Sequence, residues 1–138
     1  MRFLHSMIRT TNPEDSLRFY CDCLGLKLIR QKDYPEAKFS LYFIGESENG
    51  PQVELTHNHD DRTYSNGDQF GHLAYEVDNI YATCQHLSEM GVTILRPPRD
   101  GRMAFIKDPN GISIELLQKG DALEPESPWK EMESQGSW

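Results

Sequence analysis

The chain has 138 residues and a mass of 15.9 kDa, a size that predicts one compact domain or two very small modules. Lys and Arg total 14 against 22 for Asp and Glu, and the resulting net charge of −8 argues against a basic nucleic-acid-binding surface. No apolar run approaches the ~20 residues that span a bilayer, and the first residues lack the apolar segment of a secretory signal. The three cysteines form neither a CxxC pair nor an even disulfide framework. We therefore expect a soluble, cytoplasmic protein that binds neither nucleic acid nor membrane.

The first half of the chain predicts one strand, one helix and three further strands. Residues 3–9 form the first predicted strand, and Asn12 and Pro13 then provide an N-cap and a first helical residue. Gly25 ends the helix as its C′ residue. Apolar side chains at spacings of three and four predict the buried face of this helix: Leu17, Tyr20, Cys21 and Leu24. The three later strands are predicted at residues 26–30, 39–44 and 52–56.

The second half repeats this order. A predicted strand at residues 70–77 leads to a helix that Asp78 caps and Gly91 ends, and thirteen positions separate cap from glycine in both halves. The predicted buried face of this helix carries Ile80, Cys84 and Leu87. Three strands come next again, at residues 92–95, 102–106 and 112–117, with a strong turn signal at residues 108–111 (DPNG) before the last one.

The repeat predicts an α+β fold built from two βαβββ modules. The first module covers residues 1–56, a polar linker covers 57–69, and the second module covers 70–118. Residues 119–138 are rich in Gly, Pro, Glu and Ser, and we expect them to form an extended C-terminal tail rather than a third module. Together the modules form one domain over about residues 2–118, in which curved mixed sheets line a cup.

Four potential metal ligands lie at equivalent places of the repeat. His5 and His72 stand in the first strand of each module, and Glu54 and Glu115 stand in the last strand, on the face opposite to the apolar residues. A single strand His or Glu usually faces solvent, but a carboxylate amid apolar strand residues is costly to bury unless it is paired or metal-bound. Their equivalence favours a cup lined by two imidazoles and two carboxylates, a donor set that suits Zn, Ni, Co or Fe ions.

Arg9 shares a strand face with His5 and lies roughly 13 Å from it at ~3.3 Å per residue. Its guanidinium could form a bidentate pair with a carboxylate of a ligand that extends along this strand face. An ordinary surface arginine is the alternative interpretation. His57 and His59 match no ligand spacing, so we interpret their segment as a hydrated polar loop.

The sequence resembles the short bacterial form of glyoxalase I (lactoylglutathione lyase), in the vicinal-oxygen-chelate superfamily. The resemblance covers residues 2–118 and rests on five segments: LHSMIR at 4–9, SLRFY at 16–20, VELTHN at 53–58, FGHLA at 70–74 and AFIKDPNG at 104–111. It implies that His5, Glu54, His72 and Glu115 are the metal ligands, which are the four positions that the repeat selects. Enzymes of this type are often activated by nickel or cobalt, so Ni²⁺ or Co²⁺ is favoured and Zn²⁺ is the alternative.

The resemblance also implies a reaction. Methylglyoxal and glutathione combine to a hemithioacetal, which the enzyme isomerises to S-lactoylglutathione through an enediolate, a step that detoxifies methylglyoxal. Glu115 is then the catalytic base and Glu54 a second candidate base, while Arg9 and Asn58 bind the γ-glutamyl part of glutathione. Arg96 is the candidate for the glycyl carboxylate, although an acidic Asp68 stands where longer family members have a basic residue.

The resemblance further implies a homodimer in which His5 and Glu54 of one subunit face His72 and Glu115 of the other, giving two sites at the subunit interface. Two alternatives remain at this point. The chain could be another enzyme of the superfamily, an epimerase or a dioxygenase, or it could be a metal-free module that binds small molecules. Four intact ligand positions argue against the second alternative.

Overall fold

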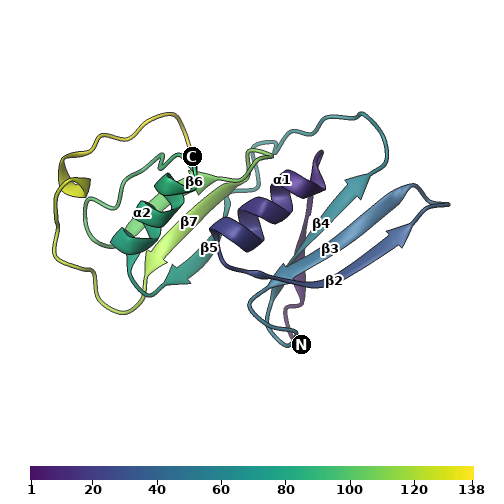
Figure 1. Cartoon of the computed structure of the whole chain (residues 1–138), viewed down its shortest axis with the longest axis horizontal. Helices are drawn as coiled ribbons and strands as arrows, with labels where there is room; N and C mark the ends of the chain where they lie inside the picture. Colours follow the sequence, from purple (N-terminus) through teal and green to yellow (C-terminus); the bar gives the residue numbers. More distant parts are fainter. The chain divides into compact units, whose positions relative to one another are not determined.

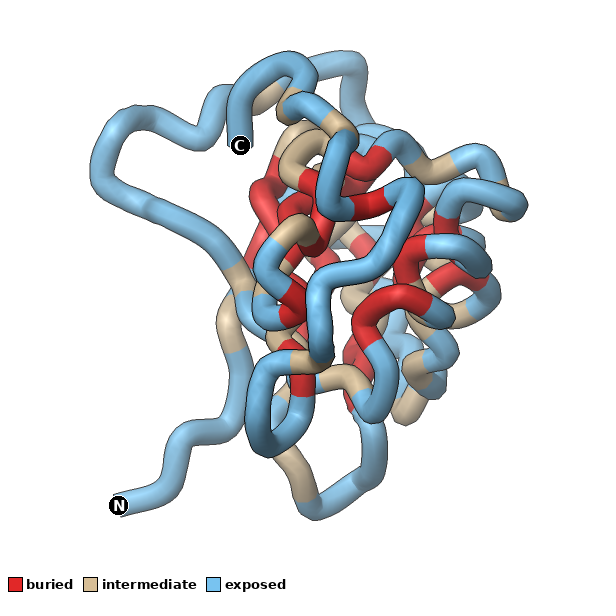
Figure 2. The backbone as a smooth tube through the Cα atoms, turned by 90° about the vertical axis from the view of Figure 1, so that its left-hand side faces the viewer, coloured by how far each residue is buried: buried red, intermediate tan, exposed pale blue.

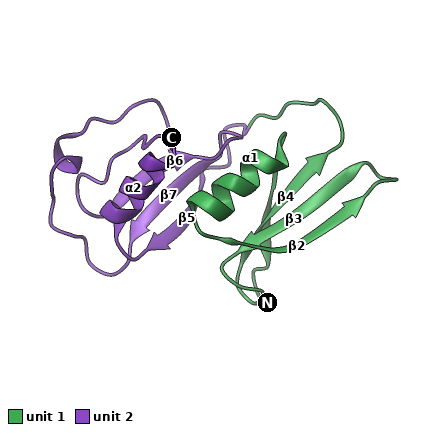
Figure 3. Ribbon diagram, viewed as in Figure 1, with its two compact units in different colours: residues 1–65 green, residues 66–138 purple.

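The computed structural model describes all 138 residues, and the chain divides into two compact units, residues 1–65 and residues 66–138 (Figure 3). The ranges predicted for the two modules, 1–56 and 70–118, each lie inside one unit. Neither unit contains a helix with the length and apolar character needed to cross a membrane. The predicted α+β class is confirmed, with one mixed sheet in each unit and helices that pack beside it (Figure 1).

The sheet of the first unit has four strands in the order β1-β4-β3-β2. Strand β1 runs parallel to β4, and the other two pairings are antiparallel. The strands are β1 (His5–Arg9), β2 (Lys27–Tyr34), β3 (Phe39–Gly45) and β4 (Gln52–Asn58). Because β4 continues to Asn58, the first two residues of the predicted linker belong to a strand.

The helical segment of the first unit starts where the sequence predicts but buries a different face. The Asn12 side chain accepts hydrogen bonds from the backbone N–H groups of Glu14 and Asp15, and α1 (Pro13–Leu17) then continues as the π-helical turn η1 (Arg18–Cys23). The buried residues are Ser16, Phe19, Tyr20 and Cys23, so only Tyr20 of the predicted set is buried. A serine can occupy this face because its hydroxyl bonds to the Thr10 hydroxyl at 2.7 Å, which satisfies both groups.

The sheet of the second unit has three strands in the order β5-β7-β6, with β5 parallel to β7 and β6 antiparallel to it. The strands are β5 (His72–Val77), β6 (Met103–Lys107) and β7 (Ser113–Gln118). Helix α2 (Ile80–Glu89) contacts β6 and β7, and its predicted residues Ile80, Cys84 and Leu87 are buried. Its N-cap is Asn79 rather than Asp78, because the Asn79 side chain accepts from the Ala82 N–H at 2.9 Å.

The strand predicted at residues 92–95 does not form, and only an isolated bridge between Arg96 and Phe105 remains in its place. Two features explain the loss. The Val92 N–H closes the end of α2 by bonding to the Leu87 carbonyl oxygen, and Pro97 supplies no N–H with which to continue a ladder. The second unit therefore keeps the predicted order of elements but lacks the fourth strand of the first.

Residues 119–138 pack on the second unit although most of them are exposed (Figure 2). The Leu123 N–H donates to the Gly101 carbonyl oxygen at 3.0 Å, and the Tyr81 hydroxyl donates to the Glu124 carbonyl oxygen at 3.0 Å. The short 3₁₀ helix η2 (Trp129–Glu131) then buries the Trp129 side chain. The tail is thus held against the unit at several points along its length.

Candidate metal centre and substrate site

Each unit brings one predicted histidine against one predicted glutamate. His5 Nε2 lies 3.1 Å from Glu54 Oε2, and His72 Nε2 lies 3.1 Å from Glu115 Oε2. In both units the two residues stand on neighbouring parallel strands, with Met7 opposite Glu54 and Ala74 opposite Glu115. Each histidine therefore precedes the residue opposite its glutamate by two positions, which places it on the same face of the sheet. The repeat seen in the sequence is also a repeat in space.

A phenylalanine completes each pair. Phe43 stands directly opposite Glu54 in the β3–β4 ladder, and Phe105 stands directly opposite Glu115 in the β6–β7 ladder. The rings contact the histidines edge-on, with centroid distances of 5.8 Å to His5 and 5.5 Å to His72. We call His5, Glu54 and Phe43 the first cluster, and His72, Glu115 and Phe105 the second cluster. Sequence reasoning missed both phenylalanines, although each stands in the penultimate strand of its module.

The two glutamates differ in their hydrogen bonding. Glu54 Oε2 faces His5, and its Oε1 accepts from the Thr56 hydroxyl at 3.4 Å. Leu117 occupies the equivalent position after Glu115 and carries no donor, so His72 is the polar partner of that carboxylate. Both glutamate side chains are 15% exposed. The Glu115 carboxylate therefore has an oxygen left to accept a proton, whereas Glu54 is held at both oxygens.

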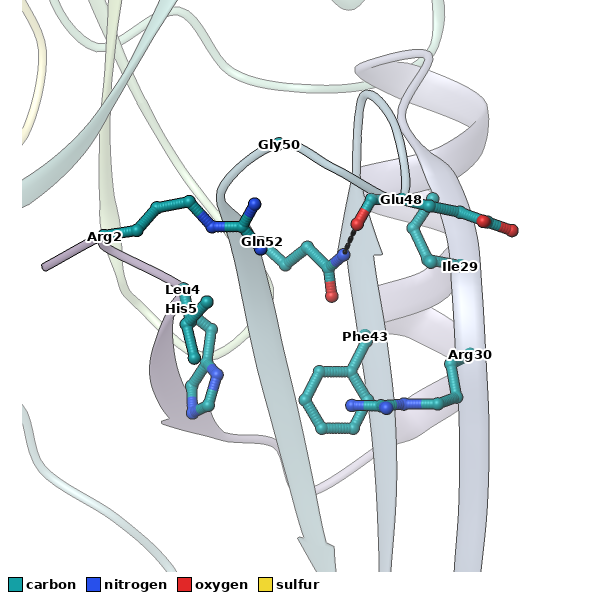
Figure 4. A pocket seen from close by; sticks show the side chains of 9 residues that line it. All are labelled: Arg2, Leu4, His5, Ile29, Arg30, Phe43, Glu48, Gly50 and Gln52. Carbon is teal, nitrogen blue, oxygen red and sulfur yellow. Dashed lines mark hydrogen bonds between the residues drawn. The ribbon is translucent and has the colours of Figure 1, made fainter.

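A cavity of about 490 Å³ adjoins His5 in the first unit (Figure 4). The Arg30 guanidinium lies over one of its walls, 4.0 Å from the centroid of the Phe43 ring. Gln52, another lining residue, donates from its Nε2 to the Glu48 carbonyl oxygen at 3.3 Å. Its lining residues are Arg2, Leu4, His5, Ile29, Arg30, Phe43, Glu48, Gly50 and Gln52. The lining thus combines apolar side chains with two guanidinium groups and one carboxylate, a mixture that can hold a ligand with both apolar and charged parts.

Arg9 and Asn58 meet at Tyr64, a residue that the sequence motifs do not single out. The Arg9 guanidinium lies 5.8 Å from the centroid of the Tyr64 ring, and Asn58 Nδ2 donates to the Tyr64 hydroxyl at 2.7 Å. An aromatic residue inside an otherwise polar segment is the signal that could have identified Tyr64. The three side chains offer a guanidinium, an amide and a phenol, which can bind a carboxylate and an amine.

Arg96 is engaged in holding its own unit together. Its Nη1 donates to the Met103 carbonyl oxygen at 2.5 Å, and its Nη2 pairs with Asp100 at 2.9 Å. The Arg96 side chain is only 18% exposed. The Arg96 guanidinium is thus occupied by protein acceptors, which argues against the expected contact with a glycyl carboxylate.

His57 and His59 also have structural partners: Thr10 O lies 3.2 Å from His57 Nδ1, and Ser40 Oγ lies 2.8 Å from His59 Nε2. Nowhere in the structure do three or more His, Cys, Asp or Glu side chains gather into a metal-binding group. The reason is that the paired strands β1/β4 and β5/β7 each supply one histidine and one glutamate.

A family model matches residues 2–116, described as the glyoxalase/bleomycin resistance protein/dioxygenase superfamily. The chain belongs to this superfamily. Within it, the chain is 44% identical over 126 residues to the lactoylglutathione lyase of Neisseria meningitidis, an alignment that covers 86% of this chain and 91% of that protein. A probable lactoylglutathione lyase of Synechocystis is also 44% identical, with 86% and 95% covered.

Solved structures of the superfamily agree. The trypanothione-dependent glyoxalase I of Leishmania major superposes with a TM-score of 0.82 at 35% identity, and 86% of each chain is covered. Both clusters lie within the matched residues 2–116, whereas the tail from residue 119 onward lies beyond them. The chemistry of the four donors, two imidazole nitrogens and two carboxylates, fits a divalent transition-metal ion.

Proposed function

We propose that the chain is a metal-dependent lactoylglutathione lyase, which isomerises the hemithioacetal of methylglyoxal and glutathione to S-lactoylglutathione. The observation that carries the proposal is the pair of equivalent His–Glu contacts, each 3.1 Å long, in a chain 44% identical to a lactoylglutathione lyase over most of both lengths. An epimerase or dioxygenase of the same superfamily is a less good match, because curated relatives at 44% and 38% identity carry the lyase name.

His5, Glu54, His72 and Glu115 would hold one divalent ion per site, with Ni²⁺ or Co²⁺ favoured over Zn²⁺. The bound ion supplies Lewis-acid stabilisation of the negative charge that develops on the two substrate oxygens. The four ligands come as two separate His–Glu pairs, so one ion would be bound by the pair of a first cluster together with the pair of a second cluster.

Glu115 is the proposed general base. It removes the proton from the hemithioacetal carbon next to the carbonyl and returns it to the adjacent carbon, which converts the enediolate to the thioester. Its oxygen that is free of protein donors is suited to carry that proton, whereas Thr56 fixes the orientation of Glu54. Glu54 is the second candidate base. Phe43 and Phe105 stand opposite the two glutamates in their ladders and contact the two histidines edge-on, which places an apolar ring beside each His–Glu pair.

Arg9 and Asn58 are proposed to bind the γ-glutamyl end of the substrate, with Tyr64 holding both side chains in place. Arg9 lies on the same strand as His5, so a tripeptide stretched along β1 can contact Arg9 while its sulfur-bearing part lies at His5. The contact is made equally in the ground state and the transition state, and it contributes to binding rather than to turnover.

We further propose a homodimer with two sites, in which the first cluster of one subunit faces the second cluster of its partner. A mixing experiment tests this arrangement. His5→Ala and Glu115→Gln proteins, each inactive alone, are refolded together. In a mixed dimer with shared sites, one site collects both defects and the other collects neither, so activity returns. If each chain builds its own site, every site keeps one defect and the mixture stays inactive.

The decisive test of function strips the protein of metal and adds back Ni²⁺, Co²⁺ or Zn²⁺ one at a time, with hemithioacetal isomerisation followed by absorbance at 240 nm. We expect full turnover with nickel and less with zinc. Turnover with zinc alone would overturn the metal preference. If no ion restores turnover while S-methylglutathione still binds, the proposed enzyme activity would be refuted and the chain would instead be a small-molecule-binding module.

A further inference from the structure

The end of the tail is fastened beside the second cluster. Arg99 Nη1 donates to the Met132 carbonyl oxygen at 3.0 Å and to the Ser134 hydroxyl at 3.1 Å. The Gln135 N–H then donates to the Leu95 carbonyl oxygen at 2.8 Å. These bonds fix residues 132–135 of the tail to one edge of the second unit, and they thereby determine where residues 136–138 lie.

Beyond Gln135 the chain turns and places Trp138 on the second cluster. Gly136 has a φ of +66° and packs against Leu95, where an added Cβ would lie 3.4 Å from a Leu95 methyl group. The Trp138 ring stacks on Phe105 with a centroid distance of 6.0 Å and an interplanar angle of 29°. Phe105 in turn contacts His72 edge-on, so a single ring separates Trp138 from the proposed ligand.

The first cluster has a different cover. The Arg30 guanidinium lies 4.0 Å from the ring centroid of Phe43, whereas the Trp138 indole stacks on the equivalent Phe105. Two clusters with the same His, Glu and Phe therefore present a cation at one and an aromatic surface at the other. The match to the superfamily ends at residue 116, so Trp138 adds to the cluster from outside the matched region.

We propose that Trp138 is a specificity-determining residue, an aromatic wall against which the carbon substituent of the 2-oxoaldehyde part of the substrate packs. The proposal rests on the proposed function. The substituent is bonded to one of the two carbons between which Glu115 moves the proton, and Phe105, on which Trp138 stacks, stands directly opposite Glu115. Trp138 is 46% exposed, which leaves ring surface free for a ligand.

This position favours a particular class of substrate. A methyl substituent is too small to use much of an indole surface, whereas a phenyl substituent can stack on it. An aromatic wall held by a fastened tail also costs little conformational entropy on binding, because an indole has only two rotatable side-chain bonds. We therefore expect Trp138 to strengthen the binding of an adduct with an aromatic substituent relative to the adduct of methylglyoxal.

The first test compares wild type, Trp138→Ala and Trp138→Phe, each loaded with Ni²⁺, on the hemithioacetals of methylglyoxal and phenylglyoxal. We expect Trp138→Ala to lower kcat/KM for the phenylglyoxal adduct by about 2- to 12-fold more than for the methylglyoxal adduct, the range of one aromatic stacking contact. Trp138→Phe keeps a ring and should recover most of the loss. An equal change for both adducts, or no change, would overturn the proposal.

The second test does not depend on turnover. S-benzylglutathione and S-methylglutathione are titrated into wild type and Trp138→Phe, and the difference in emission isolates Trp138 from the buried Trp129. The benzyl compound should change Trp138 emission with saturation and bind about 2- to 12-fold more weakly to Trp138→Ala, with the methyl compound unaffected. If the two compounds change Trp138 emission equally and lose affinity equally in Trp138→Ala, the proposed role of Trp138 would be refuted. A wild type that responds in this way yet isomerises neither adduct would refute the proposed function and leave the wall in place.

Discussion

Glu115 and Glu54 occupy equivalent positions, yet the structure predicts that replacing them has unequal consequences. Glu115→Gln keeps the size of the side chain and one oxygen ligand, but its amide cannot take up a proton. Loss of a general base typically costs 10²- to 10⁴-fold in rate. Because the Glu115 carboxylate has an oxygen free of protein donors, we expect kcat to fall by at least ~100-fold, about 2.7 kcal/mol in the activation free energy.

Glu54→Gln is the matched control. The Thr56 hydroxyl can still donate to the amide oxygen, so the side chain keeps its orientation. The substitution removes a carboxylate whose two oxygens already face Thr56 and His5 and which is therefore not the proposed base. We expect kcat to fall by less than about tenfold when Ni²⁺ saturates each protein, with bound metal quantified for both variants. Equal losses in the two variants would show that the glutamates share the proton transfer. A larger loss in Glu54→Gln would refute the reasoning from Thr56.

Three further predictions concern residues around the clusters. Arg9→Ala should raise KM about tenfold or more with kcat nearly unchanged, because it removes a charge-assisted contact of the bound substrate; an unchanged KM in steady-state assays would leave Arg9 as a surface residue. Arg96→Ala should lower the free energy of unfolding by about 1–2 kcal/mol in urea and leave KM unchanged, because Arg96 bonds to Asp100 and Met103; a raised KM would restore its substrate role. Burial raises the pKa of the Cys84 thiol from 9.0 to about 12. The thiol therefore ionises first in the unfolded chain, and the free energy of unfolding should fall by up to about 1.4 kcal/mol per pH unit between pH 9 and 12, a slope that Cys84→Ala should reduce in denaturant titrations.

The two His–Glu pairs could be predicted because they depend on local rules. Strand alternation sets which face each residue takes, and the repeat aligns the parallel neighbours β1/β4 and β5/β7 in the same way. The N-cap at Asn12 could be predicted from its side-chain chemistry alone. In these cases the partner that decides the structure lies within a few residues or at the equivalent place of the other module.

The remaining features depend on distant partners. The buried face of α1 and η1 is displaced by one residue because Ser16 finds the Thr10 hydroxyl, a contact that apolar spacing does not reveal. The strand predicted after α2 is missing because the Val92 N–H bonds to the Leu87 carbonyl oxygen at the end of the helix, and because Pro97 has no N–H to continue a ladder. The Arg9–Tyr64 contact and the stacking of Trp138 on Phe105 each join residues that lie more than 30 positions apart in the sequence. Spacing within one segment carries no information about such pairs.

The repeated module explains why both clusters contain the same proposed ligands. The side chains that lie near these ligands differ between the two units and make the two clusters unlike each other. The position four residues after the histidine holds Arg9 in the first unit and Glu76 in the second. In the proposed enzyme, a substrate carboxylate is attracted at the first position and repelled at the second, which favours binding of a carboxylate-bearing peptide end at the first unit. Trp138 provides an apolar surface beside the second cluster, where Glu115 has its free oxygen. In the proposed enzyme, the peptide end binds beside the first cluster and the reacting carbons beside the second, so a symmetric set of ligands serves an asymmetric substrate.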